Sequence, residues 1–191
     1  MAPVRPGNDI PWHHPAALPD EDLLAQCEVA LNRSSGPGGQ HRNKVQSHVE
    51  LIHRATGVRA QAGERRSASD NKRVALRRLR LALAVQVRAE VPLGEIGSVL
   101  WRSRLQSPRR GAEPANPLAG KRIVCSPDHH DYPSLLSEAL DVIAASDGDL
   151  KRAALRLDVS ASQLVRLLKG HPPALQHLNQ ERARRGLHGL R

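Results

Sequence analysis

The chain has 191 residues and a formal net charge of +10, and 2% of its residues are aromatic. This length allows one ordinary domain or two small ones, and so few aromatic side chains favour small helical units over a large β-sandwich. The sequence holds no apolar run near the roughly 20 residues of a membrane span and no apolar signal core. We therefore expect a cytoplasmic protein without a membrane partner.

The positive charge is concentrated in the middle of the chain. Residues 33–90 hold 13 Lys and Arg against 4 Asp and Glu, whereas residues 1–32 hold 1 against 5. An excess of this size favours a polyanionic partner, because each neutralised phosphate releases counterions. A basic surface that serves only solubility is the alternative.

The first half of the chain predicts a small sheet. Residues 1–19 contain five prolines and predict an extended tail. A short helix should begin near Asp20, and the alternating segment 27–32 predicts a strand. Two further strands are expected over 49–53 and 58–62, joined by a hairpin turn.

A longer helix is predicted from Asp70 to about Glu90, ending before Pro92. Its apolar side carries Leu76, Leu79, Leu83 and Val87, and another side carries Arg73, Arg77, Arg80 and Arg88. The apolar side should pack on the sheet. The arginine side would face water or RNA phosphates. Its expected closeness to the basic segment 33–44 favours RNA.

Residues 91–133 contain six prolines and predict a basic linker with a short helix around 96–105. Within it, the run Asp128-His129-His130-Asp131 is a poor metal site, because adjacent residues rarely converge on one ion. Cys27 and Cys125 lie far apart and lack the spacing of zinc ligands or of a disulfide framework. We therefore predict no metal.

Residues 134–191 predict a helical module. Helices are expected over 134–145, 149–157, 160–169 and 173–185, and the middle two meet at a tight turn with Ser160 as the cap, so the pair looks like a helix-turn-helix. Asp158 stands where such turns usually have glycine. Whether Ser162, Gln163 and Arg166 read bases or face water stays open.

Residues 33–44 form a glycine-rich basic segment with the pattern Arg33-x-Ser35-Gly36-x-Gly38-Gly39-Gln40-x-x-Asn43-Lys44. Four further motifs follow it: Val49-Glu50-Leu51-x-His53, Thr56-Gly57-Val58, Arg65-Arg66-Ser67 and Asn71-Lys72. Over about residues 20–90 the chain resembles the class I peptide-chain release factor superfamily, and within it the codon-independent ribosome-rescue peptidyl-tRNA hydrolases. The resemblance implies an α+β fold: a small mixed sheet with a packed helix and a protruding Gly-Gly-Gln loop, followed here by an all-α helix-turn-helix-like module.

The resemblance also implies the chemistry: hydrolysis of the peptidyl-tRNA ester in the ribosomal peptidyl-transferase centre. Gly38 and Gly39 let the backbone enter a crowded RNA pocket, since a Cβ would block the required torsions. The backbone amide of Gln40 can stabilise charge on the leaving oxygen, and its side chain would position the attacking water. A carboxamide has no useful pKa, so Gln40 is not a general base. No cofactor is required.

The expected partners are large-subunit ribosomal RNA and peptidyl-tRNA, with a methyltransferase acting on Gln40 as a further possibility, and the protein should be a monomer. The residues predicted to bind RNA are basic or polar and lie in or beside the loop and on the long helix: Arg33, Ser35, His41, Arg42, Asn43, Lys44, Arg65, Arg66, Lys72, Arg73, Arg77 and Arg80.

The expected organisation is a tail over 1–19, a catalytic domain over 20–90, a linker over 91–133 and a helical module over 134–191. About 32 residues precede the loop, too few for a stop-codon-reading domain, so we expect a codon-independent rescue hydrolase. Two alternatives stay open. One is a non-catalytic RNA-binding adaptor with the same fold, and the other is a helix-turn-helix DNA regulator.

Overall fold

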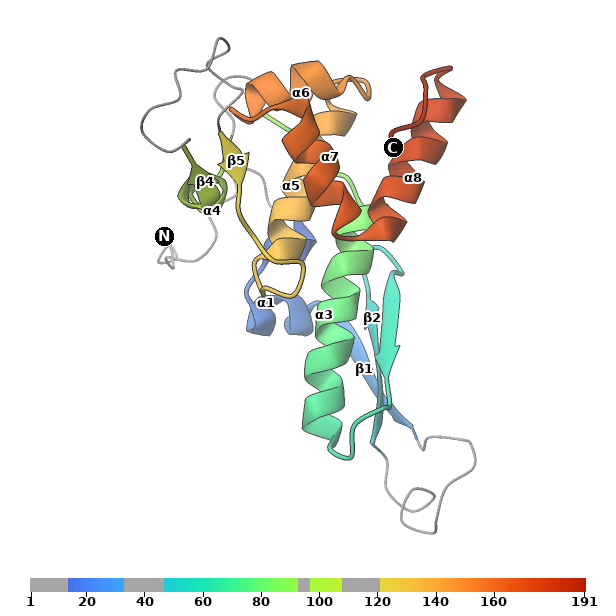
Figure 1. Ribbon diagram of the computed structural model, residues 1–191. Helices are drawn as coiled ribbons and strands as arrows, with labels where there is room; N and C mark the ends of the chain where they lie inside the picture. The colour runs from blue at the N-terminus through green and yellow to red at the C-terminus, as the bar shows by residue number, and fades with distance from the viewer. Residues whose placement is uncertain (1–13, 33–46, 93–96, 108–120) are drawn as a thin grey trace.

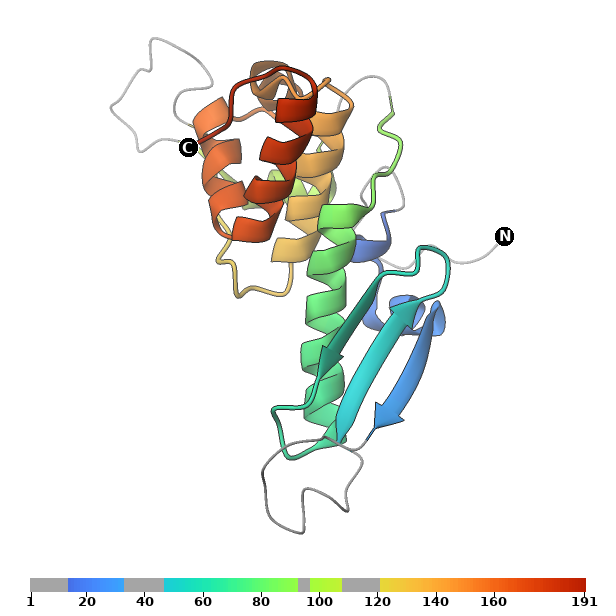
Figure 2. The same ribbon diagram turned by 90° about the vertical axis from the view of Figure 1, so that its right-hand side faces the viewer.

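A computed structural model of the chain describes residues 14–32, 47–92, 97–107 and 121–191 (Figure 1). A small antiparallel sheet lies against one long helix, and a group of helices from the second half of the chain packs at the other end of that helix (Figure 2). The predicted α+β class, with a helical C-terminal part, is confirmed. Within the described ranges, no helix combines the length and the apolar character needed to cross a membrane.

Three strands make the first sheet in the order β1-β2-β3. They are β1 (Cys27–Asn32), β2 (His48–His53) and β3 (Arg59–Ala62), and both pairings are antiparallel. The prediction of a mixed sheet is therefore wrong in this detail. The reason lies in the connections, because each strand pairs with its sequence neighbour and no crossover helix intervenes. Between β2 and β3 the chain turns at Gly57, whose φ of +69° suits glycine.

Helix α3 (Ala68–Gln86) covers the sheet through the apolar side that the sequence predicts. Leu76, Leu79 and Leu83 are buried on this helix, which contacts β2 and β3. The helix ends at Gln86, four residues before the predicted end, because Val87 is extended and Arg88 folds back. The Arg88 guanidinium donates to the carbonyl oxygens of Ala84 at 2.8 Å and Val85 at 2.6 Å, so it satisfies acceptors that the helix leaves free at its end.

The segment before the sheet is folded in its described part. A 3-10 helix, η1 (Pro15–Ala17), is followed by α1 (Asp20–Ala25), which confirms the predicted helix start. His14 is fully buried, although the sequence predicted an extended tail over this segment. Its Nδ1 accepts the Ala16 amide at 3.0 Å and its Nε2 lies 3.2 Å from the Val87 carbonyl oxygen, so this histidine joins the tail to the end of α3.

The described parts of residues 91–133 also contain regular structure. Helix α4 (Val99–Arg104) lies in the predicted place and leads into β4 (Leu105–Gln106), which pairs with β5 (Arg122–Ile123). The Trp101 indole is buried and donates to the Leu157 carbonyl oxygen at 2.9 Å. This stretch therefore packs on the C-terminal helices, a contact that its proline content did not indicate.

Four helices complete the fold: α5 (Tyr132–Ala144), α6 (Leu150–Arg156), α7 (Ala161–Lys169) and α8 (Pro172–Arg184). Helix α5 is buried along its length and contacts α3. Between α6 and α7 the chain turns at Asp158, whose φ is +56°, and the Asp158 carboxylate pairs with Lys121. Asp158 thus takes the left-handed conformation for which glycine is the usual residue.

Candidate catalytic and RNA-binding site

The site begins with the two strand ends that carry the glycine-rich segment. Asn32, the last residue of β1, pairs with His48, the first residue of β2. The connection that contains Gly38, Gly39 and Gln40 therefore leaves and re-enters at one end of the sheet. Figure 1 places this end beside the N-terminal end of α3, away from α6.

The residues predicted to be catalytic lie outside the described residues, as do half of the residues predicted to bind RNA: Arg33, Ser35, His41, Arg42, Asn43 and Lys44. Their roles stay predictions. What the structure shows is the frame to which this segment is attached.

Asn71, in the first turn of α3, holds that frame together. Its side chain is fully buried, and its Nδ2 donates to the Ser47 carbonyl oxygen at 2.5 Å and to the Arg65 carbonyl oxygen at 3.0 Å. Its Oδ1 accepts the Arg65 amide at 2.8 Å. One carboxamide therefore joins the residue that precedes β2, the turn after β3 and the start of α3. The sequence showed Asn71 only as part of a motif and gave no signal of this role.

His48 and Gly63 form a second contact between the start of β2 and the turn after β3. The His48 ring passes over Gly63 so closely that a Cβ added there would lie 2.5 Å from Nδ1. The His48 Nε2 lies 3.2 Å from the Gln61 side-chain oxygen. A side chain at position 63 would therefore push this ring away from its place beside the base of the connection.

Four of the cations predicted to bind RNA lie in the turn after β3 and in the first turns of α3. Arg65 and Arg66 are exposed on the turn that follows β3, and Arg73 is exposed in α3, where it pairs with Asp70. Lys72 is half-buried. Among the described residues, no carboxylate lies within ion-pair distance of Arg65, Arg66 or Lys72. These three cations are available to an anion from outside the chain.

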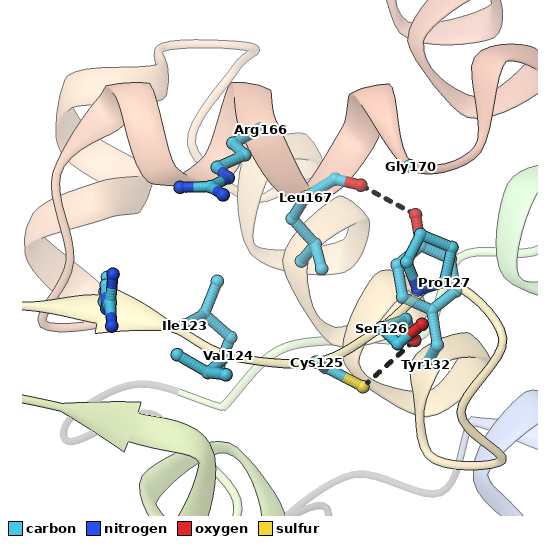
Figure 3. Close-up of a pocket in the computed structure, with 10 residues that line it drawn as sticks. Ile123, Val124, Cys125, Ser126, Pro127, Tyr132, Arg166, Leu167 and Gly170 are labelled. Atoms are coloured by element: carbon cyan, nitrogen blue, oxygen red, sulfur yellow. Dashed lines mark hydrogen bonds between the residues drawn. The ribbon is translucent and has the colours of Figure 1, made fainter.

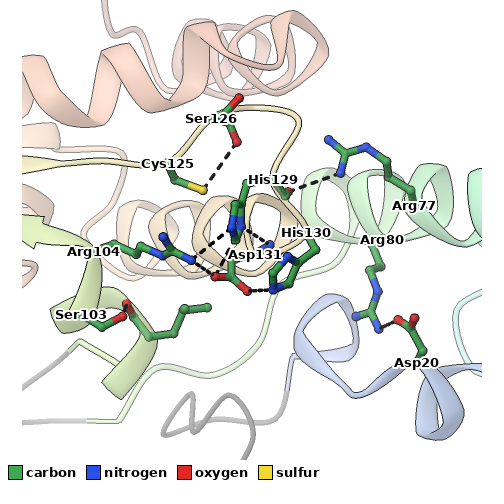
Figure 4. A network of polar contacts seen from close by, with 11 residues as sticks. Asp20, Arg77, Arg80, Ser103, Arg104, Cys125, Ser126, His129, His130 and Asp131 are labelled. Atoms are coloured by element: carbon green, nitrogen blue, oxygen red, sulfur yellow. Dashed lines mark hydrogen bonds and ion pairs between the residues drawn. The ribbon is translucent and has the colours of Figure 1, made fainter.

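Arg77 and Arg80, predicted to bind RNA, make contacts inside the molecule (Figure 4). The Arg80 guanidinium donates to the Ala16 carbonyl oxygen at 2.8 Å and pairs with Asp20 at 2.6 Å, with 11% of its side chain exposed. Arg77 donates to the carbonyl oxygens of Pro127 and, at 3.3 Å, His129. Both arginines connect α3 to other segments, so their contacts favour a structural role over an RNA contact.

Glu64 and Arg78 form a pair that the sequence did not single out. Arg78 donates to Glu64 at 2.7 Å and to the Gln61 carbonyl oxygen at 2.8 Å, which ties the end of β3 to α3. Hydrogen bonds from the backbone amides of Glu64 and Gly63, with Arg78 adding to them, hold the pKa of the Glu64 carboxyl below its usual value. The carboxylate is therefore charged and paired beside the base of the connection.

His129, His130 and Asp131 converge, although the sequence argued against a metal there. Their possible ligand atoms lie within 4.8 Å of one another. The Arg104 guanidinium donates to the Asp131 carboxylate, and His130 Nε2 lies 3.0 Å from the other carboxylate oxygen (Figure 4). Because a fixed cation already neutralises Asp131, this cluster is better suited to holding α4 against α5 than to binding a metal ion.

The part of the chain that forms this sheet and its covering helix matches a known domain family. Residues 20–93 match the family model described as the RF-1 domain. This part of the chain therefore carries an RF-1 domain, and over it the chain is similar to peptide chain release factors.

Three relatives illustrate the similarity. Over 132 residues the chain is 34% identical to peptide chain release factor 1 of Frankia casuarinae. The aligned part covers 66% of the chain and 37% of the relative. It is 37% identical over 94 residues to an uncharacterized peptide chain release factor-like mitochondrial protein of Saccharomyces cerevisiae, covering 47% of the chain and 58% of the relative. It is 41% identical over 68 residues to the chloroplastic peptide chain release factor PrfB1 of Arabidopsis thaliana, covering 36% of the chain and 14% of the relative. The matched part thus spans between 14% and 58% of the length of these three proteins.

Proposed function

We propose that this protein hydrolyses the ester that joins a nascent peptide to tRNA on the ribosome, and that it does so without reading a stop codon. The observation that carries the proposal is the pairing of Asn32 with His48, which places both ends of the segment that contains Gly38, Gly39 and Gln40 at one end of an RF-1 domain. The proposal of codon independence rests on the resemblance of residues 20–90 to the codon-independent ribosome-rescue hydrolases, which the sequence motifs carry.

The proposed reaction needs an exposed tip and a stable base. The base is provided by Asn71 and His48, whose contacts bind Ser47 and β2 to α3 and to the turn after β3. At the tip, water attacks the ester carbonyl carbon, the bond to the ribose oxygen breaks, and that oxygen takes a proton. The backbone amide of Gln40 stabilises charge on the leaving oxygen, at a typical value of about 3 kcal/mol for one such donor.

Large-subunit ribosomal RNA and peptidyl-tRNA are the proposed partners. Arg65, Arg66 and Lys72 would fasten the corner beside the loop to phosphates, and exposed Arg73 would extend the contact along α3. The cations of residues 33–44 would act at the tip itself. In this scheme residues 20–90 form the catalytic domain and residues 134–191 a helical module that packs against α3.

The test is a release assay with ribosomes that hold labelled peptidyl-tRNA at a stop codon, on a truncated message, or at an intact sense codon. Release on the truncated message, abolished by Gly39→Ala, is the expected result. Gly189→Ala is the matched control, because an added Cβ there makes ordinary contacts of 3.8 Å with Asn179. Release that requires the stop codon would overturn codon independence. Ribosome binding without release would favour the non-catalytic adaptor.

A further inference from the structure

A groove of about 350 Å³ lies between β5 and α7, away from the end of the sheet that carries the proposed catalytic loop (Figures 1 and 3). One wall is the segment from Arg122 to Pro127, and the other is formed by Arg166 and Leu167 of α7. A volume of this size admits a ligand about as large as a nucleotide.

The groove combines two kinds of surface. Arg122 and Arg166 line it and are both exposed, and none of the described residues that line it is acidic. Ile123, Val124 and Leu167 provide apolar surface, and Val124 is 38% exposed, although it is a large aliphatic residue. Figure 3 shows the side chain of Arg166 on the α7 side, above Ile123 and Val124. Two guanidinium groups beside an apolar wall suit a ligand that joins an anion to a flat apolar body.

Among the described residues, no acidic side chain competes for the two arginines. In the described part of the chain no carboxylate lies within ion-pair distance of Arg122 or Arg166, and the Arg122 guanidinium donates to the neutral Gln106 side chain at 3.4 Å. The nearby Lys121, in contrast, is paired with Asp158. A guanidinium left unpaired presents its donors to phosphate in the fork geometry that phosphate accepts.

The groove is held in a fixed shape. The Tyr132 hydroxyl donates to the Leu167 carbonyl oxygen at 2.7 Å and so joins the start of α5 to α7 (Figure 3). From the groove the exposed side of α7 continues with Ser162, Arg166 and Lys169, which share one helical side at i, i+4 and i+7. Cations thus extend past the groove along the helix, as contact with a chain of phosphates requires.

We infer that the α7–β5 groove binds a nucleotide of single-stranded RNA, with the backbone phosphate held by Arg122 and Arg166 and the base against Ile123 and Val124. Single-stranded RNA fits better than a duplex, because a base can enter a pocket only where it is unpaired. Lys169 would contact the next phosphate. This contact does not depend on peptide release. It would give the protein a second RNA-binding site, at the end of the molecule opposite the proposed catalytic loop.

The test uses the full chain and a fluorescent single-stranded RNA oligonucleotide, with affinity measured by anisotropy at several salt concentrations. The double variant Arg122→Gln/Arg166→Gln should bind several-fold more weakly, and its salt slope should fall by about 1.4, since each lost phosphate contact on a single strand contributes about 0.7. Arg184→Gln/Arg191→Gln removes the same charge from exposed positions outside the groove and should keep the parent slope.

Hydrogen exchange locates the contact independently of the loop. Saturating RNA should slow exchange in residues 122–126 and 163–170 of the parent and leave these segments unprotected in the groove variant. A parent-like salt slope in that variant, or no protection of either segment, would overturn the inference. Tighter binding of duplex DNA that is lost in the groove variant would overturn it in favour of a DNA-binding module. Displacement of groove-bound RNA by an acidic peptide that binds there more tightly would point instead to a protein ligand.

Discussion

The Nδ2 of Asn71 donates to the Ser47 carbonyl oxygen at 2.5 Å, across 24 residues of sequence, and this bond joins the start of α3 to the residue before β2. The same carboxamide also binds both backbone groups of Arg65. The base of the proposed catalytic loop is therefore fixed by a buried side chain that does not belong to the loop.

Replacing Asn71 with Ala should weaken both the fold and the loop base. The change leaves three partly buried backbone groups without the Asn71 carboxamide as their partner, so we expect the free energy of unfolding to fall by about 2–3 kcal/mol. Denaturation in urea measures this loss. Faster hydrogen exchange at residues 47–49 under native conditions would show that the base of the loop has loosened, and the release rate should fall with it.

Asn179→Ala is the matched control, because Asn179 binds both backbone groups of Leu190, with its Nδ2 donating at 3.1 Å and its Oδ1 accepting at 2.7 Å, far from the loop. It should lower stability without changing exchange at residues 47–49. An Asn71→Ala protein with parent-like exchange there would show that Asn71 does not hold the loop base.

Glu138 predicts a pH dependence of stability. It is buried on α5 and accepts hydrogen bonds from the Ser98 amide and hydroxyl, both at 2.7 Å. Burial raises the pKa of this carboxyl to about 7 against these bonds. Because the pKa is raised in the folded state, the stabilising contribution is fully present below about pH 4.5 and is lost as the pH rises through 7. The loss amounts to about 3 kcal/mol.

Urea denaturation between pH 4.5 and 8 tests this prediction. The difference in stability between the parent and Glu138→Gln should change across this window, since the amide keeps the shape of the protonated carboxyl and does not ionise. Glu28→Gln, at an exposed position of β1, removes the same charge and should run parallel to the parent. If the Glu138→Gln curve also runs parallel, the carboxyl does not titrate in this range.

His14 should act in the opposite direction. Burial lowers its pKa to about 4, and Arg88 adds to this, while the bond to the Val87 carbonyl works against it. A lowered pKa means that the neutral ring is favoured in the fold, so this contribution is present above pH 6.5 and is lost as the pH falls toward 4. The full loss is again about 3 kcal/mol.

His14→Asn removes the titrating group while keeping a side-chain oxygen that can accept the Ala16 amide. Its unfolding free energy should be lower than that of the parent at pH 7, because the bond to Val87 is missing, and this difference should shrink on acidification. His188→Asn, at an exposed position, serves as the control. A constant difference between His14→Asn and the parent from pH 7 to pH 4 would contradict the prediction.

The sequence predicted those parts of the fold that depend on neighbouring residues. The alternation of residues 27–32 and the leucine spacing of α3 are local patterns, and both elements formed. The burial of His14, the contacts of Arg77 and the packing of Trp101 join residues that lie 73, 50 and 56 positions apart. No periodicity shows which distant carbonyl a side chain will reach. For the same reason the role of Asn71 was hidden, although its motif was visible.

The two α3 arginines Arg73 and Arg80 have the same predicted role but different surroundings, which a pair of substitutions can separate. Arg80→Gln removes the bond to Ala16 and the pair with Asp20, so the carbonyl loses its partner and the free energy of unfolding should fall by about 1–2 kcal/mol. Arg73 is 81% exposed and pairs with Asp70 across one helical turn, so Arg73→Gln should change stability by less than about 0.5 kcal/mol.

Ribosome or RNA binding supplies the second measurement. Arg73→Gln should weaken binding and lower its salt slope by about 1 unit for one lost phosphate contact, because the side chain points into solvent beside the loop base. Arg78→Gln is the control on the same helix, since Arg78 is held by Glu64 and the Gln61 carbonyl. An Arg80→Gln protein as stable as the parent would show that the contact with η1 contributes little, and would return Arg80 to the set of RNA-binding candidates.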